Sequence, residues 1–323
     1  MSKRTRKDKE TSSNPNIQGV VSAYRDGPVV RVAPDLIAVE GSVAWPEVYH
    51  HRSGGRAEFR KIPNFFFPGD NITIIGGNTS EIHRRQRRHL AHAFSEAAMY
   101  EQEPIIKKYV DPLVERLAEL AKPGNAMNIV HWFNFATFDI IGDLAFADSF
   151  HSLESSNYHP WVKAIFQNVK AASYRGFLNA YPVLQVLNYV KRASALREEQ
   201  QNREYAAANA QARMSMGSNL KGGRRDFMTY MLRENRDGEQ GMSDIEIMAH
   251  SSVLVGAGSE TTATALLGLF FHLSQNPDVC QLLKDEIRST FSDEAQITMR
   301  STEPLPYLKA CLEETLRCYP PAP

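Results

Sequence analysis

The sequence is poor in several features that define large classes of protein. Its 323 residues include only three cysteines, Cys280, Cys311 and Cys318, whose spacing fits neither a secreted disulfide framework nor a zinc site. Its 37 basic residues balance 37 acidic ones, so no overall positive charge favours nucleic acid. No stretch reaches the roughly 18 apolar residues of a membrane span. We therefore expect one large domain, or two smaller ones, in a reducing compartment.

The first residues, MSKRTRKDKETSSNPNIQG, are polar and basic and have no apolar centre. They resemble neither a signal peptide nor a membrane anchor. We expect residues 1–16 to form a disordered arm, with a specific basic signal as the alternative. On this basis the chain is expected to be cytoplasmic, or peripheral to a membrane.

Proline is absent between Val183 and Asn276, which predicts long helices there and argues against a β-rich region. Earlier in the chain, β-branched residues around a Pro-Asp pair predict two short strands within residues 28–40, followed by a short helix. Apolar residues at helical spacing predict helices in segments 81–95, 104–122, 128–150 and 159–172. The fold class is therefore mainly α with a small β part.

The longest predicted helix begins at a capping box formed by Ser243 and Glu246 and ends before Pro277. Apolar residues occur around its whole circumference, so we expect it to be mostly buried. Its middle is VGAGSETTAT, residues 255–264, where glycines and hydroxyl side chains weaken a helix.

Three interpretations of VGAGSETTAT are open. It can be a helix-packing notch with a surface glutamate. It can be a groove, in which Gly256 and Gly258 admit another group to a locally opened helix and Glu260 with Thr261 forms a proton-relay pair. It can also be the strand-turn-helix of a dinucleotide site, although the third glycine and a second strand with a terminal acid are missing.

A second motif, YLKACLEETLRCYPPAP at residues 307–323, places Glu314 and Arg317 three residues apart on a helix. Such a pair usually lies in solvent, but the neighbouring Leu308, Leu312 and Leu316 indicate burial. Taken in order, A-G-S-E-T-T at 257–262, the helix NPDVCQLLKDEI and the E-x-x-R helix resemble the I, J and K helices of a cytochrome P450.

Other segments support the resemblance. YRDGPVVRVAPD resembles the first strand pair of the family, HRRQRRHLAHAFS its C helix and FDIIGDLAFADSF its E helix. The sequences of segments such as HRRQRR and LPYLKACLEETLR are similar to those of filamentous-fungal cytochromes P450 that tailor terpenoid or polyketide secondary metabolites. The resemblance implies a partial cytochrome P450 domain over residues 17–323, reaching through the K helix and C-terminally incomplete.

The resemblance also implies roles around a haem b cofactor. Thr261 would steer protons to dioxygen above the iron, and Glu260 would connect Thr261 to solvent. Ala257 and Gly258 would form the groove on the oxygen side. Glu314 and Arg317 would be structural and brace the opposite, proximal side.

His83 and Arg87 stand where the family has W-x-x-x-R facing the haem propionates, so Arg87 would keep that contact and His83 replaces the tryptophan. A solvated basic face or a nucleic-acid patch is the alternative for HRRQRR. The lack of interleaved aromatics and the neutral chain disfavour nucleic acid.

The chain departs from the family in having no F-x-x-G-x-x-x-C-x-G motif, which carries the cysteine that ligates the iron. We interpret the three cysteines as small core or surface residues, so no metal ligand is assigned. The arginine that would join Glu314 and Arg317 is missing as well. We therefore expect a chain truncated before the haem-ligand loop, with weak or no haem binding and little activity.

For the whole enzyme, the resemblance implies O2-dependent hydroxylation or epoxidation of a lipophilic substrate, with electrons from NADPH-cytochrome P450 reductase at the endoplasmic-reticulum membrane. Substrate-facing positions are expected at residues 65–78, 172–177 and 251–255, which are mostly apolar. The alternative is a non-catalytic helical remnant that binds a partner or an apolar ligand.

Overall fold

The computed structural model describes residues 27–50, 56, 58–59, 61, 72–76, 79–122, 124, 126–167, 192–218, 220, 223–232 and 241–322. The arm predicted at residues 1–16, and the predicted substrate-facing residues 65–71, 77–78 and 172–177, lie outside these ranges. The chain divides into two compact units, Met1–Ile62 and Pro63–Pro323.

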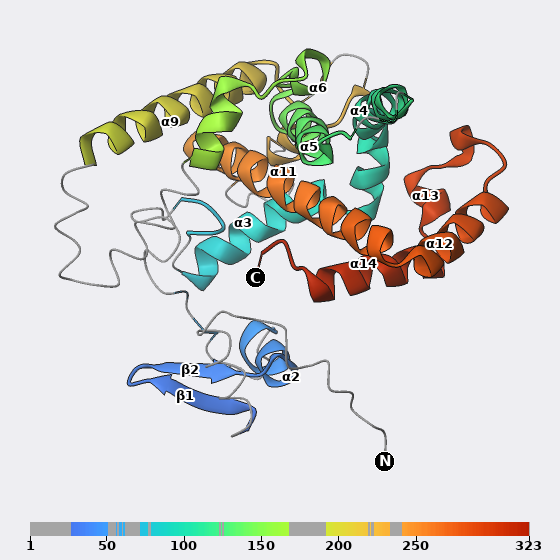
Figure 1. Ribbon diagram of the computed structural model, residues 1–323. Helices are drawn as coiled ribbons and strands as arrows, with labels where there is room; N and C mark the ends of the chain where they lie inside the picture. Colours follow the sequence, from blue (N-terminus) through green and yellow to red (C-terminus); the bar gives the residue numbers. More distant parts are fainter. Residues whose placement is uncertain are drawn as a thin grey trace. The chain divides into compact units, whose positions relative to one another are not determined.

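The first unit contains the predicted hairpin and short helix (Figure 1). Strand β1 (Val29–Ala33) pairs antiparallel with β2 (Leu36–Val39), with Val29 opposite Val39. Pro34 and Asp35 form the turn between them, as the sequence predicts. The helical turns α2 (Gly41–Ala44) and η3 (Trp45–Tyr49) follow directly.

The regular secondary structure in the described residues of the second unit is helical (Figure 1). Its helices are α3 (Ser80–Ala93), α4 (Glu96–Ala121), α5 (Ile129–Phe146), α6 (Ser152–Ser155), α9 (Arg192–Ser215), α10 (Phe227–Met231), α11 (Asp244–Gln275), α12 (Pro277–Thr290), η6 (Glu294–Gln296), α13 (Met299–Thr302) and α14 (Pro306–Cys318). Residues 160–167 are helical as well. The mainly α prediction is confirmed.

Local chemistry sets several helix ends. The Ser243 hydroxyl accepts from the Glu246 amide at 3.3 Å and the Glu246 carboxylate accepts from the Ser243 amide at 2.9 Å, which confirms the predicted capping box of α11. Helix α4 begins earlier than predicted because Ser95 caps it, accepting from the Ala98 amide at 3.3 Å. The helix continues through Pro104, which the sequence had suggested as its start.

Helix α5 ends earlier than predicted. Ala147 adopts a left-handed conformation with φ of 59°, which stops the helix. The buried Asp139 carboxylate then accepts from the amides of Ser152 at 3.0 Å and Leu153 at 2.8 Å, so it caps α6 and turns the chain back over α5. Burial raises the pKa of Asp139, and these two amide bonds oppose that rise.

The core is centred on α5, which packs most extensively against α11 and also contacts α4, α9 and α6 (Figure 1). Nearly every side chain from Trp132 to Phe146 is buried, and Phe138 is 0% exposed. Aromatic rings meet edge to face along this helix, and the centroids of Phe135 and Tyr158 are 4.8 Å apart. Most residues of α5 are apolar and they occur around its circumference, which favours a position inside the core, and its two aspartates are paired there.

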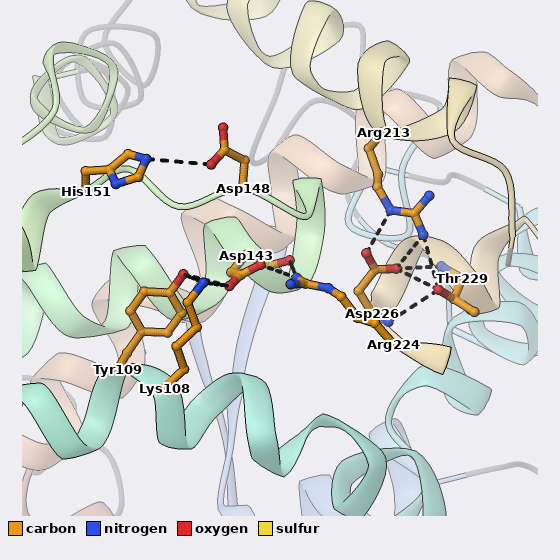
Figure 2. A network of polar contacts seen from close by, with 9 residues as sticks. All are labelled: Lys108, Tyr109, Asp143, Asp148, His151, Arg213, Arg224, Asp226 and Thr229. Atoms are coloured by element: carbon orange, nitrogen blue, oxygen red, sulfur yellow. Dashed lines mark hydrogen bonds and ion pairs between the residues drawn. The ribbon is translucent and has the colours of Figure 1, made fainter. Parts of the chain in front are cut away.

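Two buried charge networks tie the helices around this core (Figure 2). Asp143 on α5 accepts from the Tyr109 hydroxyl at 2.6 Å and from Lys108 at 3.1 Å, and it pairs with Arg224. Nearby, Arg213 on α9 forms a forked pair with Asp226, and both side chains are 0% exposed.

The prediction that α11 is mostly buried was wrong. A seam of residues four apart is buried against the core, namely Ile247, Ser251, Val255, Ser259 and Ala263. The other side is open: Ile245 is 62% exposed and Phe271 is 61% exposed. The helix packs against α5, α9 and α14, and within the described part of the chain these elements cover only part of its circumference.

Candidate functional site

The centre of α11 is a regular α-helix, so the predicted local opening at VGAGSETTAT is not present. The hydroxyls bond back within the helix: Thr261 Oγ1 donates to the Ala257 carbonyl at 2.5 Å and Thr262 Oγ1 to the Gly258 carbonyl at 2.8 Å. Each bond shares a carbonyl with the i→i−4 ladder and leaves that ladder intact. The hydroxyl of Thr261 is thereby held against the backbone of Ala257 on one side of the helix.

The two glycines have different surroundings. A Cβ at Gly258 would lie 2.7 Å from Ile141 Cδ1 on α5, whereas a Cβ at Gly256 would meet nothing within 4 Å. Gly258 is thus the packing notch between α11 and α5. Gly256 and the exposed Ala257 lie on the open part of the helix. The packing notch at Gly258 is therefore confirmed, and Gly256 faces open space two residues earlier.

Glu260 and Thr261 are both half-buried beside this notch. Burial raises the pKa of the Glu260 carboxyl. The negative charge of Glu260 also contributes to the raised pKa of Tyr158, after the larger effect of burial on that phenol, so the two side chains are within electrostatic reach. A carboxyl whose pKa moves toward neutrality is better suited to pass protons at physiological pH.

The predicted propionate contacts lie on α3. His83 is half-buried and Arg87, one turn later, is exposed. Within the described part of the chain, Arg87 makes no hydrogen bond or ion pair. Its guanidinium is therefore available for an anionic partner, as the sequence prediction requires.

The opposite face of α3 carries a contact that sequence reasoning missed. Arg85 forms a forked ion pair with Glu246 at the start of α11, donating to Oε2 at 3.1 Å, and also donates to the Gly241 carbonyl at 3.0 Å. Gln86 donates to the same carboxylate at 3.1 Å. Burial alone would raise the pKa of Glu246, but Arg85 and the neighbouring donors hold that pKa at about 2.

Burial of Glu314 and Arg317 is a second prediction that was wrong. Arg317 donates to both carboxylate oxygens of Glu314, at 2.7 and 2.6 Å. The side chain of Arg317 is 69% exposed and that of Glu314 is 60% exposed. This forked pair holds the pKa of Glu314 at about 2. Helix α14 instead turns Thr315 toward Gly268 of α11, so the E-x-x-R face points away from the packed side.

The three cysteines are free thiols, with Cys280 and Cys311 half-buried and Cys318 exposed. This agrees with their interpretation as small core or surface residues. In the described ranges no cluster of three His, Cys, Asp or Glu side chains could hold a metal ion. Arg87 and Thr261 present the group types that a haem's propionates and oxygen side would contact, a guanidinium and a hydroxyl, whereas none of these thiols stands in a glycine-rich loop.

Helix α11 alone, among the described residues, is long and apolar enough to cross a bilayer, with a mean hydropathy of 1.3. The expectation that no stretch meets this test was therefore wrong. Packing against α5, α9 and α14 places one seam of this helix in the core of the second unit, while apolar side chains such as Ile245 and Phe271 stay exposed.

Comparison with known proteins places this geometry in a family. The cytochrome P450 family model matches residues 37–323. The chain is 40% identical over 301 residues to the cytochrome P450 monooxygenase aclL of Aspergillus oryzae, covering 92% of this chain and 60% of that protein. It is 38% identical over 321 residues to the trichothecene C-4 hydroxylase of Trichoderma arundinaceum, covering 95% and 62%.

The chain thus spans about 60% of the length of the curated relatives it matches. A mutant of the cytochrome P450DA heme domain has the same fold, with a TM-score of 0.76 at 19% identity over 95% of this chain and 66% of that chain. The mainly helical fold, the order of its motifs and these matches agree. The chain belongs to the cytochrome P450 family.

Proposed function

We propose that residues 17–323 form the oxygen-side part of an O2-dependent monooxygenase that hydroxylates or epoxidises a lipophilic secondary metabolite. The observation that carries this proposal is the Glu260–Thr261 pair, half-buried beside the α11–α5 packing notch and next to the exposed Ala257. Residues 1–16 are proposed as an arm outside this domain.

A terpenoid or polyketide-like compound is the proposed substrate class. Two relatives are named as hydroxylases of trichothecenes, at C-4 and at C-15. In α11, Val253 and Leu254 are half-buried among the predicted substrate-facing positions 251–255, while Ser251 and Val255 turn into the core. Apolar side chains at a partly open helix face favour an apolar ligand.

Haem b, when bound with a thiolate ligand, supplies the oxygen activation. The residues of this chain would hold and move protons beside it. Because Thr261 Oγ1 donates its own hydrogen to the Ala257 carbonyl, its lone pairs remain free to accept a hydrogen bond on the open side. Glu260, with its raised pKa, would take up protons from solvent and pass them to the Thr261 hydroxyl. Arg87 would pair with a carboxylate of the haem.

Electrons would come from NADPH-cytochrome P450 reductase at the endoplasmic-reticulum membrane. We further propose that Cys280, Cys311 and Cys318 do not ligate iron, so this chain by itself binds haem weakly. That leaves a second candidate function, a non-catalytic helical remnant binding an apolar ligand or a partner. The exposed Leu312 and Leu316 on α14, at 39% and 48%, favour such binding.

The proposal is tested on a chimera that joins Pro323 to the residues of aclL that follow its matched region. We expect NADPH- and O2-dependent oxidation of an apolar terpenoid. Glu260→Gln and Thr261→Ala should each lower turnover by about 100-fold, the usual size of a lost proton-transfer group. Thr262→Ala is the matched control, since Thr262 makes the same back-bond on the neighbouring residue. Equal losses in all three variants would contradict the assigned roles.

A further inference from the structure

His250 is a fully buried histidine on α11 with bonds on both ring nitrogens. Its side chain is 1% exposed. Nε2 lies 2.9 Å from the backbone nitrogen of Ile74, which is 176 residues away in the chain. Nδ1 lies 2.7 Å from the carbonyl oxygen of Glu246, one turn earlier on the same helix. The ring thus connects α11 to the segment at residues 72–76.

The chemistry of these partners fixes the state of the ring. A backbone N–H can only donate, so Nε2 must accept from Ile74. A backbone carbonyl can only accept, so Nδ1 must carry the hydrogen that reaches Glu246. The imidazole is therefore neutral and in its Nδ1–H form. A protonated ring, or the other tautomer, would set a donor against the Ile74 N–H.

The same segment is held from α3. Gln86, which is 0% exposed, donates to the Ile72 carbonyl and to the Glu246 carboxylate. Within the segment, the Gly76 amide donates to the buried Thr73 hydroxyl at 3.3 Å and closes a turn. Residues 72–76 are thus bonded to α11 through His250 and to α3 through Gln86, and Gln86 is itself bonded to Glu246 in the first turn of α11.

We propose that His250 is a positioning residue that fixes residues 72–76 against the start of α11. Given the proposed function, on which this part rests, that segment forms one wall of the substrate site, next to the half-buried residues 252–254 of the same helix. His250 does not touch the reacting atoms. It sets the position of the wall by accepting the backbone hydrogen bond of Ile74 at Nε2.

The test measures hydrogen exchange at the Ile74 amide in the chain as it exists, read by fragmentation mass spectrometry. His250→Phe removes the acceptor, and we expect exchange at Ile74 to accelerate about tenfold, the factor that corresponds to one lost hydrogen bond. His250→Gln keeps an acceptor at the Nε2 position and should stay within roughly threefold of the original rate. His272→Phe, the same substitution on the same helix, is the matched control and should leave Ile74 unchanged.

If His250 only filled space, His250→Phe would change exchange at many core amides and would have no specific effect at Ile74. His250→Gln would then not restore the original rate at Ile74. Unchanged exchange at Ile74 in His250→Phe, or equal acceleration in His272→Phe, overturns the proposal. If His250→Phe fails to fold, nitrogen-15 spectra of the histidine rings in the unaltered chain decide: an Nδ1–H tautomer at His250 supports the proposal, and an Nε2–H or charged ring overturns it. Failure of the monooxygenase proposal would appear separately, as absent turnover in the chimera with these results intact.

Discussion

Removing the charge of Asp226 should destabilise the second unit more than any surface change. Arg213 Nε donates to Asp226 Oδ2 at 2.8 Å and Nη2 donates to Oδ1 at 2.9 Å, with both side chains 0% exposed (Figure 2). Asp226 also caps α10, accepting from the Thr229 amide at 2.9 Å. Asp226→Asn keeps the shape and a cap oxygen but leaves the guanidinium of Arg213 buried without its counter-charge.

The expected loss for Asp226→Asn is about 3–5 kcal/mol of unfolding free energy, as for other buried pairs that lose one partner. Asp226→Ala should lose about 1 kcal/mol more, because the helix cap disappears as well. Arg213→Met combined with Asp226→Leu should be less destabilised than either single change, since no unpaired charge remains buried.

Urea unfolding followed by circular dichroism measures these differences as shifts of the midpoint at constant slope. Glu119→Gln, which breaks the exposed pair of Arg116 and Glu119, is the control and should change the midpoint little. A midpoint for Asp226→Asn within about 1 kcal/mol of the original would refute the reasoning, because a buried charge would then be tolerated without its partner.

Two further predictions concern pH and packing. Burial alone would raise the pKa of Asp143, but Tyr109 and Arg224 lower it below the value of the unfolded chain. Its contribution to stability is therefore complete above the unfolded pKa and lost as pH falls through the folded one. Asp143→Asn should flatten the acid limb of a stability-against-pH curve, and an unchanged limb would contradict this. Gly258→Ala should lower the unfolding free energy by about 1–2 kcal/mol because its Cβ meets α5. Gly256→Ala, whose Cβ would face open space, should raise the unfolding free energy by about 0.5–1 kcal/mol. The two variants should therefore shift the thermal unfolding midpoint in opposite directions, and equal shifts would contradict the packing difference between the two glycines.

Features set by neighbouring residues could be predicted from the sequence. The capping box of Ser243 and Glu246 and the stop before Pro277 act within one turn, so both ends of α11 were predicted correctly. The hairpin turn at Pro34 and Asp35 is equally local. The order of the A-G-S-E-T-T and E-x-x-R motifs was enough to indicate the family, which the family model confirms.

Burial and long-range pairing could not be predicted in this way. The apolar residues of α11 gave no sign of which side α5 would cover, and so Phe271 was expected inside and lies outside. The segment HRRQRR by itself does not distinguish Arg85 from Arg87. Arg85 pairs with Glu246, which lies 161 residues later in the chain, whereas Arg87 is exposed. These outcomes depend on the packing of whole helices, which adjacent residues do not encode.

We propose that α11 lies on the oxygen side of a haem, that Arg87 on α3 pairs with a haem carboxylate, and that none of Cys280, Cys311 and Cys318 ligates the iron. The reduced, carbon-monoxide difference spectrum of haem-loaded protein tests this proposal most directly. We expect a thiolate-type spectrum from the chimera with aclL and none from this chain alone. A thiolate-type spectrum from the chain alone, or none from a folded chimera, would contradict it.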